Sequence, residues 1–456
     1  MKTILYTLLI TLLFVSCKKE QKVDYTVISG TILNGESKNL RLSGLNNSFN
    51  KTIDISEKGT FNDTLNVDAG HYMIFTDGGV VYLYLEPSYS LNLSLNVKDY
   101  SSSIKFSGEG SEINNYLVAK RKKQHELEGK NVFEVNEADF KKLQNDIRTV
   151  LIAFLSTQNE LPESYKKKEK RNIKYTYLNK LNDYEFYHAH YTKNPDFKVS
   201  EEFLKEGEEL DYNNEEDYFF SYGYANLVGT YYNEQAEKIA ESESIPHDVA
   251  LMKAIGTATN DSIKNTLLYK KAQFGVTYTS DIEAYYTAFM EASTNQKHKD
   301  AITENYTILR TTSKGKPSPK FVDYKNNAGG TTSLDDLKGK YVYIDVWATW
   351  CAPCKAEIPF LKEVEQKYHD KNIEFVSISI DSSKDHDKWK KMVADMELGG
   401  IQLMADNDFK SKFVEEYFIK GIPKFILLDP DGIIINPNAP RPSDDKLIDL
   451  FNQLNI

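Results

Sequence analysis

Two cysteines three positions apart are the residues of this sequence best suited to chemistry. They stand in the run Trp350-Cys351-Ala352-Pro353-Cys354, where a predicted strand ends and a predicted helix begins. Thiols at this spacing can close a small disulfide loop. A helix N-terminus carries partial positive charge and unpaired N–H groups, which favour a thiolate over a thiol. We therefore expect Cys351 to be the nucleophile and Cys354, inside the first helical turn, to resolve the intermediate.

The same cysteine spacing also occurs in zinc sites and in inert structural disulfides. A zinc site would need two more ligands, and the one further cysteine, Cys17, stands in the N-terminal segment. His369 and His386, the histidines nearest to the motif in sequence, are not paired at metal-ligand spacing. His188 and His190 are two residues apart, so on a helix they point to different sides. The sequence therefore predicts no metal site.

Two further features favour redox chemistry at the cysteine pair. Asp345 lies six residues before Cys351 inside an apolar run. Burial there would raise the pKa of its carboxylate, which could then accept the proton of Cys354 directly or through water. Ile422-Pro423 precedes another predicted strand. A cis proline at this point could bring the backbone of Ile422 beside the disulfide, ready to pair with an extended substrate.

The order of these residues resembles the active-site pattern of the thioredoxin superfamily. The run 345–354, DVWATWCAPC, is followed by Pro359 and then by Ile422-Pro423, as in that family. A proline inside the helix after the cysteines should kink that helix. The similarity covers about residues 317–456 and implies a thioredoxin-like α/β fold for them.

Three further features are more similar to the membrane-anchored TlpA/ResA branch of this superfamily. They are Phe321, the stretch 333–340 and Glu357. In that branch the acid matching Glu357 lies near the active site and tunes it. The resemblance thus implies four catalytic residues, Cys351, Cys354, Asp345 and Glu357. It also implies five residues that contact the substrate, Trp350, Ala352, Pro353, Ile422 and Pro423.

This resemblance implies an envelope thiol–disulfide oxidoreductase that reduces periplasmic protein disulfides. It implies no cofactor other than the Cys351–Cys354 disulfide, protein thiols and disulfides as partners, and electrons supplied by a membrane reductase. One use of such reductants is to keep the haem-attachment cysteines of c-type cytochrome precursors reduced.

Two alternatives from other functional classes remain. A peroxide-reducing relative would need Thr or Ser three residues before the reactive cysteine and Pro further upstream, but Ala348 and Ile344 stand there. A binding protein would use its front domains to capture a peptide, a glycan or a partner, with the thioredoxin-like domain secondary. Nothing in the sequence excludes the second alternative.

The N-terminus predicts export and a lipid anchor. A basic residue, Lys2, is followed by a largely apolar segment at 4–15, too short to span a bilayer, and then by Ser16 and Cys17. This order is typical of a secretory signal peptide. Residues 14–17, FVSC, resemble a bacterial lipobox, which implies that Cys17 is lipidated. We expect a mature protein anchored in the cell envelope, facing the periplasm or exposed at the surface.

Two more domains are predicted ahead of the α/β region, so the chain is multidomain. At 24–108 apolar residues alternate with polar ones, as in Leu91, Leu93 and Leu95, which predicts strands of an antiparallel β-sandwich-like domain. At 109–312 apolar residues recur at helical spacing, which predicts an all-α domain.

A further predicted domain boundary lies between the helical domain and the α/β domain. The segment 311–319 is rich in polar, Gly and Pro residues and is typical of a linker. After it, predicted strands at 341–347, 373–380 and 425–428 alternate with helices, the first of them at 355–368.

The composition excludes one class of partner. The chain has 456 residues, with 67 acidic against 56 basic residues and a formal net charge of −11. A dedicated nucleic-acid-binding protein would show a basic face. We therefore expect no nucleic-acid partner.

Overall fold

The computed structural model describes residues 24–45, 49–207 and 210–456. The predicted signal peptide and the predicted lipidation site, Cys17, lie outside these residues. Within the described part, no helix is both long and apolar enough to cross a membrane.

The chain folds into two compact units. The first ends at Leu210 and takes in Glu216–Leu227 as well, and the second consists of Asp211–Glu215 and Val228–Ile456. Helix α6 (Tyr222–Glu243) passes from the first unit into the second. The predicted helical region is therefore shared between the two units.

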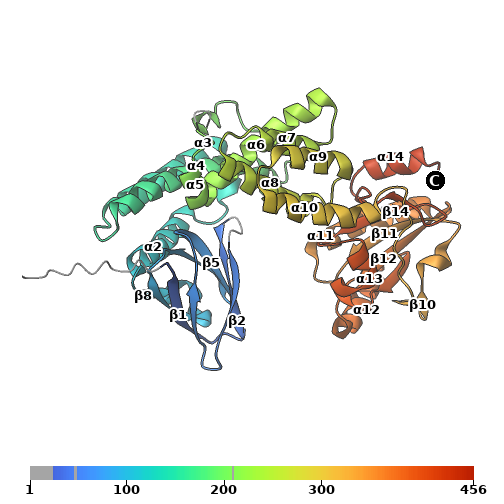
Figure 1. The fold of residues 1–456 in the computed structure, drawn as a ribbon, viewed down its shortest axis with the longest axis horizontal. Helices are drawn as coiled ribbons and strands as arrows, with labels where there is room; N and C mark the ends of the chain where they lie inside the picture. The colour runs from blue at the N-terminus through green and yellow to red at the C-terminus, as the bar shows by residue number, and fades with distance from the viewer. Residues whose placement is uncertain (1–23, 46–48, 208–209) are drawn as a thin grey trace, which may run out of the picture. The chain divides into compact units, whose positions relative to one another are not determined.

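Two four-stranded sheets form the β part of the first unit (Figure 1). The first sheet, in spatial order, contains β3 (Asn50–Asp54), β2 (Asn39–Gly44), β5 (Gly70–Thr76) and β6 (Gly79–Leu85). The second contains β4 (Thr60–Leu65), β1 (Thr26–Leu33), β7 (Ser90–Asn96) and β8 (Lys105–Gly108). The alternating leucines of β7 are buried, as their pattern predicts, and pack with residues of both sheets in one core.

The prediction of a wholly antiparallel sandwich is wrong for one pair of strands. β1 and β7 run parallel, with Ile28 opposite Leu91. Alternation of apolar and polar residues specifies which face of a strand is buried, but not the direction of its neighbour. β1 and β7 are far apart in sequence, and the intervening strands supply the long connection that a parallel pair requires.

Helices complete the first unit. They are α1 (Tyr100–Ser103), α2 (Ser111–Glu128), α3 (Glu137–Ser156), α4 (Glu163–Thr192) and most of α5 (Glu215–Phe220). The apolar face of α3 is buried through Phe140, Ile147 and Leu151. Helix α2 is tied to β6 through Asn114, whose side chain accepts from the Tyr84 N–H at 2.8 Å and donates to the Tyr84 carbonyl at 2.9 Å.

Four α-helices lie between α6 and the sheet of the second unit. They are α7 (His247–Gly256), α8 (Asp261–Gly275), α9 (Ile282–Ala292) and α10 (Gln296–Leu309). The side chains of Asn260, Asp281 and Asn295 each accept a hydrogen bond from the first turn of the helix that follows. Such caps fix where α8, α9 and α10 begin.

The segment predicted as a linker is attached to the sheet that follows. The Gly315 N–H donates to the Ile434 carbonyl at 2.8 Å, and the Ser318 N–H donates to the Gly432 carbonyl at 2.9 Å. Pro317 forms an isolated bridge with Ile433. The polar, Gly- and Pro-rich composition suggested a free linker, but the open edge of the sheet binds this backbone.

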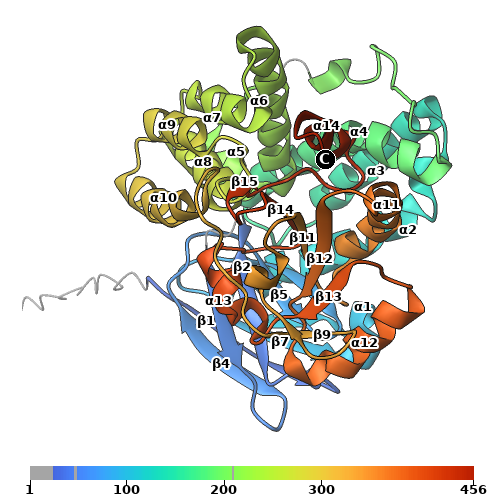
Figure 2. The same cartoon turned by 90° about the vertical axis from the view of Figure 1, so that its right-hand side faces the viewer.

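The last part of the second unit is built on a seven-stranded sheet. In spatial order its strands are β10 (Thr331–Thr332), β9 (Tyr324–Asn326), β13 (Ile401–Met404), β12 (Ile373–Ser379), β11 (Tyr341–Trp347), β14 (Lys424–Leu428) and β15 (Ile434–Asn436). Strands β11, β12 and β13 are parallel, and β14 is antiparallel to β11. Figure 2 shows β14, β11, β12 and β13 in this order. The prediction of alternating strands and helices here is confirmed.

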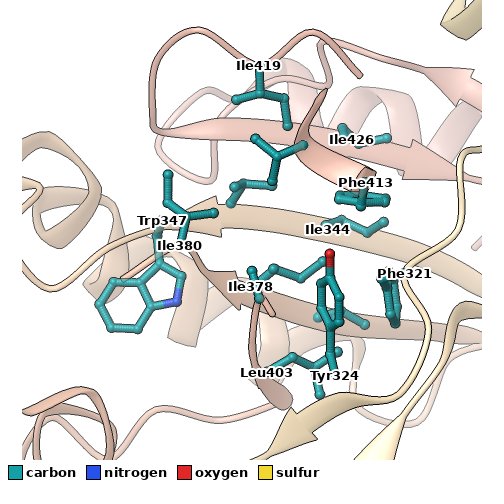
Figure 3. Packing of buried hydrophobic residues seen from close by; sticks show 14 of the residues in the cluster. Phe321, Tyr324, Ile344, Trp347, Ile378, Ile380, Leu403, Phe413, Ile419 and Ile426 are labelled. Atoms are coloured by element: carbon teal, nitrogen blue, oxygen red, sulfur yellow. The ribbon is translucent and has the colours of Figure 1, made fainter. Parts of the chain in front are cut away.

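Successive residues of β11 face two different cores. Tyr343 packs in a cluster with residues of α11 (Ala352–Tyr368) and α14 (Lys446–Gln453). Ile344 packs with residues of α12 (His386–Asp395) and α13 (Lys412–Glu416), and Figure 3 shows it close to Phe413 of α13. Helices cover both faces of the sheet, so β11 is a nearly continuous apolar run. An ionisable residue in this strand must therefore be buried.

Candidate active site

A disulfide joins the two motif cysteines at the start of α11. The Cys351 and Cys354 Cα atoms are 5.3 Å apart. Cys351 caps the helix, and its Sγ accepts a hydrogen bond from the Cys354 N–H at 3.2 Å. Pro353 lies in the first turn, where its missing N–H leaves no helical bond unmade. The helix N-terminus thus holds a sulfur that could carry negative charge after reduction.

Exposed residues surround these buried sulfurs. Trp350, Ala352 and Pro353 are exposed, whereas each cysteine is only 4% exposed. The Trp350 ring lies 6.3 Å from the ring of Phe409, measured between centroids. An incoming disulfide would therefore first meet an apolar, partly aromatic rim.

A buried aspartate that the sequence reasoning missed holds the segment leading to Cys351. Asp381 accepts hydrogen bonds from the Thr349 N–H and the Thr349 hydroxyl, both at 2.8 Å. It also accepts from the Ser379 hydroxyl at 2.8 Å. The sequence did contain a feature that could have identified Asp381. This residue directly follows a predicted strand, and the carboxyl ends of parallel strands share one edge of a sheet.

Asp345 is buried on β11, as predicted from its apolar neighbours. Its Oδ1 atom has no hydrogen-bond partner among the described residues. Burial raises the pKa of Asp345 to about 8, and the nearby negative charges of Glu365 and Glu357 add to the rise, while a hydrogen bond with Ser377 opposes it. The carboxyl group can therefore exchange a proton near neutral pH.

Glu357 lies one turn after Cys354 on α11 and is buried. It accepts hydrogen bonds from the Ser443 N–H at 3.1 Å and the Ser443 hydroxyl at 3.0 Å, and Arg441 lies 3.9 Å away. These contacts tie α11 to the loop before α14. Glu357 therefore has a positioning contact as well as an electrostatic effect on the pKa of Asp345.

Glu365 is a second acid of α11 that the sequence reasoning did not single out. It contributes more than Glu357 to the raised pKa of Asp345, and burial raises its own pKa to about 7. Its spacing from Leu361 places it on the helix face that meets the sheet. The helical spacing between Leu361 and Glu365 was the feature of the sequence that could have identified this acid.

The Ile422–Pro423 peptide bond is cis, as considered from the sequence. Strand β14 begins at the next residue, Lys424, which pairs with Val346 of β11. Because the strands are antiparallel, the start of β14 lies at the end of β11 that leads to the cysteines. Ile422 packs against the core cluster that contains both cysteines. The predicted residues thus meet at one edge of the sheet.

The described part of the chain contains no group of three or more His, Cys, Asp or Glu side chains that could hold a metal ion. The reactive side chains described at this edge are the two cysteines and the neighbouring carboxylates.

Comparisons with known proteins point to the same region. A family model described as thioredoxin-like matches residues 339–434. Thiol-disulfide oxidoreductase ResA of Bacillus thuringiensis (strain Al Hakam) is 32% identical over 133 residues, which are 29% of this chain and 73% of that protein. ResA of Bacillus subtilis (strain 168) is 27% identical over 142 residues, which are 31% of this chain and 75% of that protein.

A solved structure also resembles this region. It belongs to a candidate thiol-disulfide oxidoreductase from Bacteroides vulgatus and is 53% identical, with a TM-score of 0.28, over 31% of this chain and 90% of that chain. The matches to ResA cover about three quarters of those relatives but less than a third of this chain. Because of this similarity to ResA, the chain belongs to the thioredoxin-like thiol-disulfide oxidoreductases of the TlpA/ResA type.

Proposed function

We propose that this protein reduces disulfide bonds of other proteins outside the cytoplasm. The observation that carries the proposal is the Cys351–Cys354 disulfide at the N-terminus of α11, on the sheet edge that also holds the cis-proline loop. A binding protein without redox activity is not favoured, since the chain belongs to a family of redox enzymes.

The reaction begins with the reduced form of the pair. The Cys351 thiolate attacks one sulfur of the substrate disulfide, an S–S bond forms between enzyme and substrate, and the other substrate sulfur leaves as a thiolate. The Cys354 thiolate then attacks the Cys351 sulfur and releases the second substrate thiol. The substrate gains two electrons and the enzyme is left as the Cys351–Cys354 disulfide. A membrane reductase of the disulfide-reductase type must return two electrons to it.

The residues around the pair have distinct roles in this scheme. Asp345 accepts the proton that Cys354 loses before it attacks, and its raised pKa suits that exchange at neutral pH. Glu357 helps to set the pKa of Asp345. The exposed Trp350, Ala352 and Pro353 and the Ile422-Pro423 loop contact the substrate, which lies extended along the loop.

The N-terminal segment and the relatives support a location in the cell envelope. The FVSC run at residues 14–17 supports lipidation of Cys17 and attachment to the cell envelope. The ResA relatives favour a site of action outside the cytoplasm. One substrate class consistent with this location is the haem-attachment cysteines of c-type cytochrome precursors.

Insulin reduction by the full chain, with dithiothreitol as electron source, tests the redox proposal. We expect turnover by the wild type and a loss of at least 100-fold in Cys351→Ser, because the variant lacks the nucleophile and Cys354 alone cannot close an intramolecular disulfide. Ser383→Ala, at an exposed position shortly after β12, serves as the control and should retain turnover. Equal rates for wild type and Cys351→Ser would contradict the proposal.

Fractionation tests the anchor separately. We expect the wild type in the membrane fraction of the producing bacterium and Cys17→Ser in the soluble fraction, because the substitution removes the acylated sulfur. The lipid-anchor proposal fails if both proteins fractionate alike.

A further inference from the structure

The turn between α8 and α9 is bound to the start of β14. The Lys424 ammonium donates to the Thr277 carbonyl at 2.9 Å, and the Asn438 amide donates to the Thr279 carbonyl at 2.8 Å. Lys424 also donates to the Asn438 side chain. The carbonyls on both sides of Tyr278 are therefore held by groups of the thioredoxin-like domain, which fixes where this tyrosine lies.

Tyr278 lies directly against the cis-proline loop. A Cβ atom placed on Gly421 would stand 2.8 Å from the Tyr278 hydroxyl oxygen. The Lys424 ammonium lies 5.4 Å from the centre of the Tyr278 ring, within cation–π range. The tyrosine therefore approaches this loop so closely only because residue 421 has no side chain.

This loop belongs to the active-site edge. Ile422 packs against the cluster that contains Cys351 and Cys354, and Lys424 pairs with Val346 near the end of the strand that leads to them. Although its backbone is fixed, Tyr278 remains 44% exposed. An aromatic surface thus stays accessible beside the cis-proline loop.

We propose that Tyr278 is a specificity-determining residue of the redox site: it supplies, from the helical segment, a wall of the surface that receives an extended polypeptide carrying a disulfide. This inference rests on the function proposed above. The ring packs against an apolar side chain next to the substrate cysteine, while the backbone of the substrate follows the Ile422-Pro423 loop.

The local chemistry fits this role. Burial raises the pKa of the Tyr278 phenol, so its hydroxyl stays protonated and can donate to a substrate carbonyl. Trp350 and Phe409 supply aromatic surface beside the cysteines. A substrate with apolar residues around its cysteine would bury apolar surface against Tyr278 and against the Trp350–Phe409 pair. The helical segment ahead of the sheet in the second unit thereby takes part in substrate selection.

Two peptides test the proposal, each with one intramolecular disulfide and differing in whether Phe or Gly stands next to the cysteine. Full-length wild type, Tyr278→Ala and Tyr278→Phe are compared by KM and kcat, with dithiothreitol as electron source. In Tyr278→Ala we expect KM for the Phe peptide to rise at least fivefold, KM for the Gly peptide to change less than twofold, and kcat to stay within twofold. Tyr278→Phe should keep the preference, because the ring remains.

Two controls separate substrate binding from a structural role. Tyr25→Ala removes a tyrosine of similar exposure from the first unit and should change neither constant. The equilibrium potential of the cysteine pair against glutathione should be the same in Tyr278→Ala and wild type. If KM for the Phe peptide is unchanged, or if kcat and the unfolding midpoint fall together, the inference is overturned while the proposed function stands.

A second substitution tests the same contact from the loop, without changing Tyr278. Gly421→Ala pushes the phenol away from the loop, so we expect it to raise KM for the Phe peptide as Tyr278→Ala does. The double variant should be no worse than either single one, because both remove the same contact. Additive effects would overturn the inference. A wild type that turns over no disulfide would overturn the proposed function, and this inference with it.

Discussion

The two units of this protein each bury a carboxylate, but in opposite surroundings. In the first unit, Glu169 of α4 forms an ion pair with Lys120 and accepts hydrogen bonds from the Tyr116 hydroxyl at 3.2 Å and the Asn172 amide at 2.9 Å. In the second unit, Asp345 has one buried oxygen without a hydrogen-bond partner among the described residues. The charges that act on it most strongly are two acids of α11.

The pKa values of Glu169 and Asp345 reflect this difference in surroundings. Burial acts to raise the pKa of both groups. For Glu169 the ammonium of Lys120 and the hydrogen bonds outweigh burial, and its pKa is lowered. For Asp345 the neighbouring charges add to burial, and its pKa rises to about 8. The first site favours the ionised carboxylate, whereas the second penalises ionisation, as is common where a carboxyl group serves in catalysis.

Asp345→Asn should give the largest effect. The carboxyl group loses its proton near pH 4 in the unfolded chain and near pH 8 in the folded one. Between these values the folded state holds more protons, so the free energy of unfolding falls as pH rises. Asn does not ionise, so at pH 9 the variant should be more stable than the wild type by on the order of 5 kcal/mol, at about 1.4 kcal/mol per pKa unit.

Tryptophan fluorescence during urea unfolding measures this change, because Trp347, Trp350 and Trp389 all lie in the second unit. Asp381→Asn is the matched control, since Asp381 is also buried but accepts three hydrogen bonds. It should be destabilised. If the difference in the free energy of unfolding between Asp345→Asn and wild type is the same at pH 5 and pH 9, the contrast drawn between Asp345 and Glu169 is wrong.

Lys120→Met should have the next largest effect. It leaves Glu169 buried and without its cation, which costs about 3–5 kcal/mol in the first unit. Amide hydrogen exchange in α4, followed by mass spectrometry, reports this loss, while tryptophan fluorescence should stay unchanged. The exposed Lys142–Asp146 pair supplies a control, because solvent screens this pair and Lys142→Met should leave the stability of the first unit nearly unchanged. Equal losses in the two variants would show that Glu169 does not depend on its partner.

Glu365→Gln should give the smallest effect and sharpen the account of Asp345. Removing one negative charge should lower the pKa of Asp345 by roughly half a unit to one unit, or about 1 kcal/mol. The measurement is the pH at the midpoint of the change in the free energy of unfolding, compared between Glu365→Gln and the wild type. Glu363→Gln removes the same charge from an exposed position of α11. If both substitutions move the midpoint equally, the effect of Glu365 is not local.

Much of this active site could be predicted from the sequence, because its signals are local. The cysteine spacing, the apolar run around Asp345 and the proline before a strand are each contained in a few neighbouring residues. Each has a direct structural consequence, namely a disulfide, a buried carboxyl group and a cis peptide bond.

The remainder depends on contacts between distant segments that carry no periodic pattern. The parallel pairing of β1 with β7, the backbone bonds of residues 315 and 318 to the sheet edge, and the contact of Tyr278 with Gly421 are of this kind. A tyrosine in a turn gives no sign in its own neighbourhood of the loop that it meets. Such contacts follow from how whole elements pack, which composition and spacing do not specify.

The most direct test of the redox account is a single turnover of the fully reduced wild-type chain with a disulfide peptide, quenched with acid and resolved by mass spectrometry. The account predicts a transient peptide adduct on Cys351, followed by one reduced peptide per chain and a Cys351–Cys354 disulfide. An adduct that forms first on Cys354, or peptide reduction without any adduct, would contradict it.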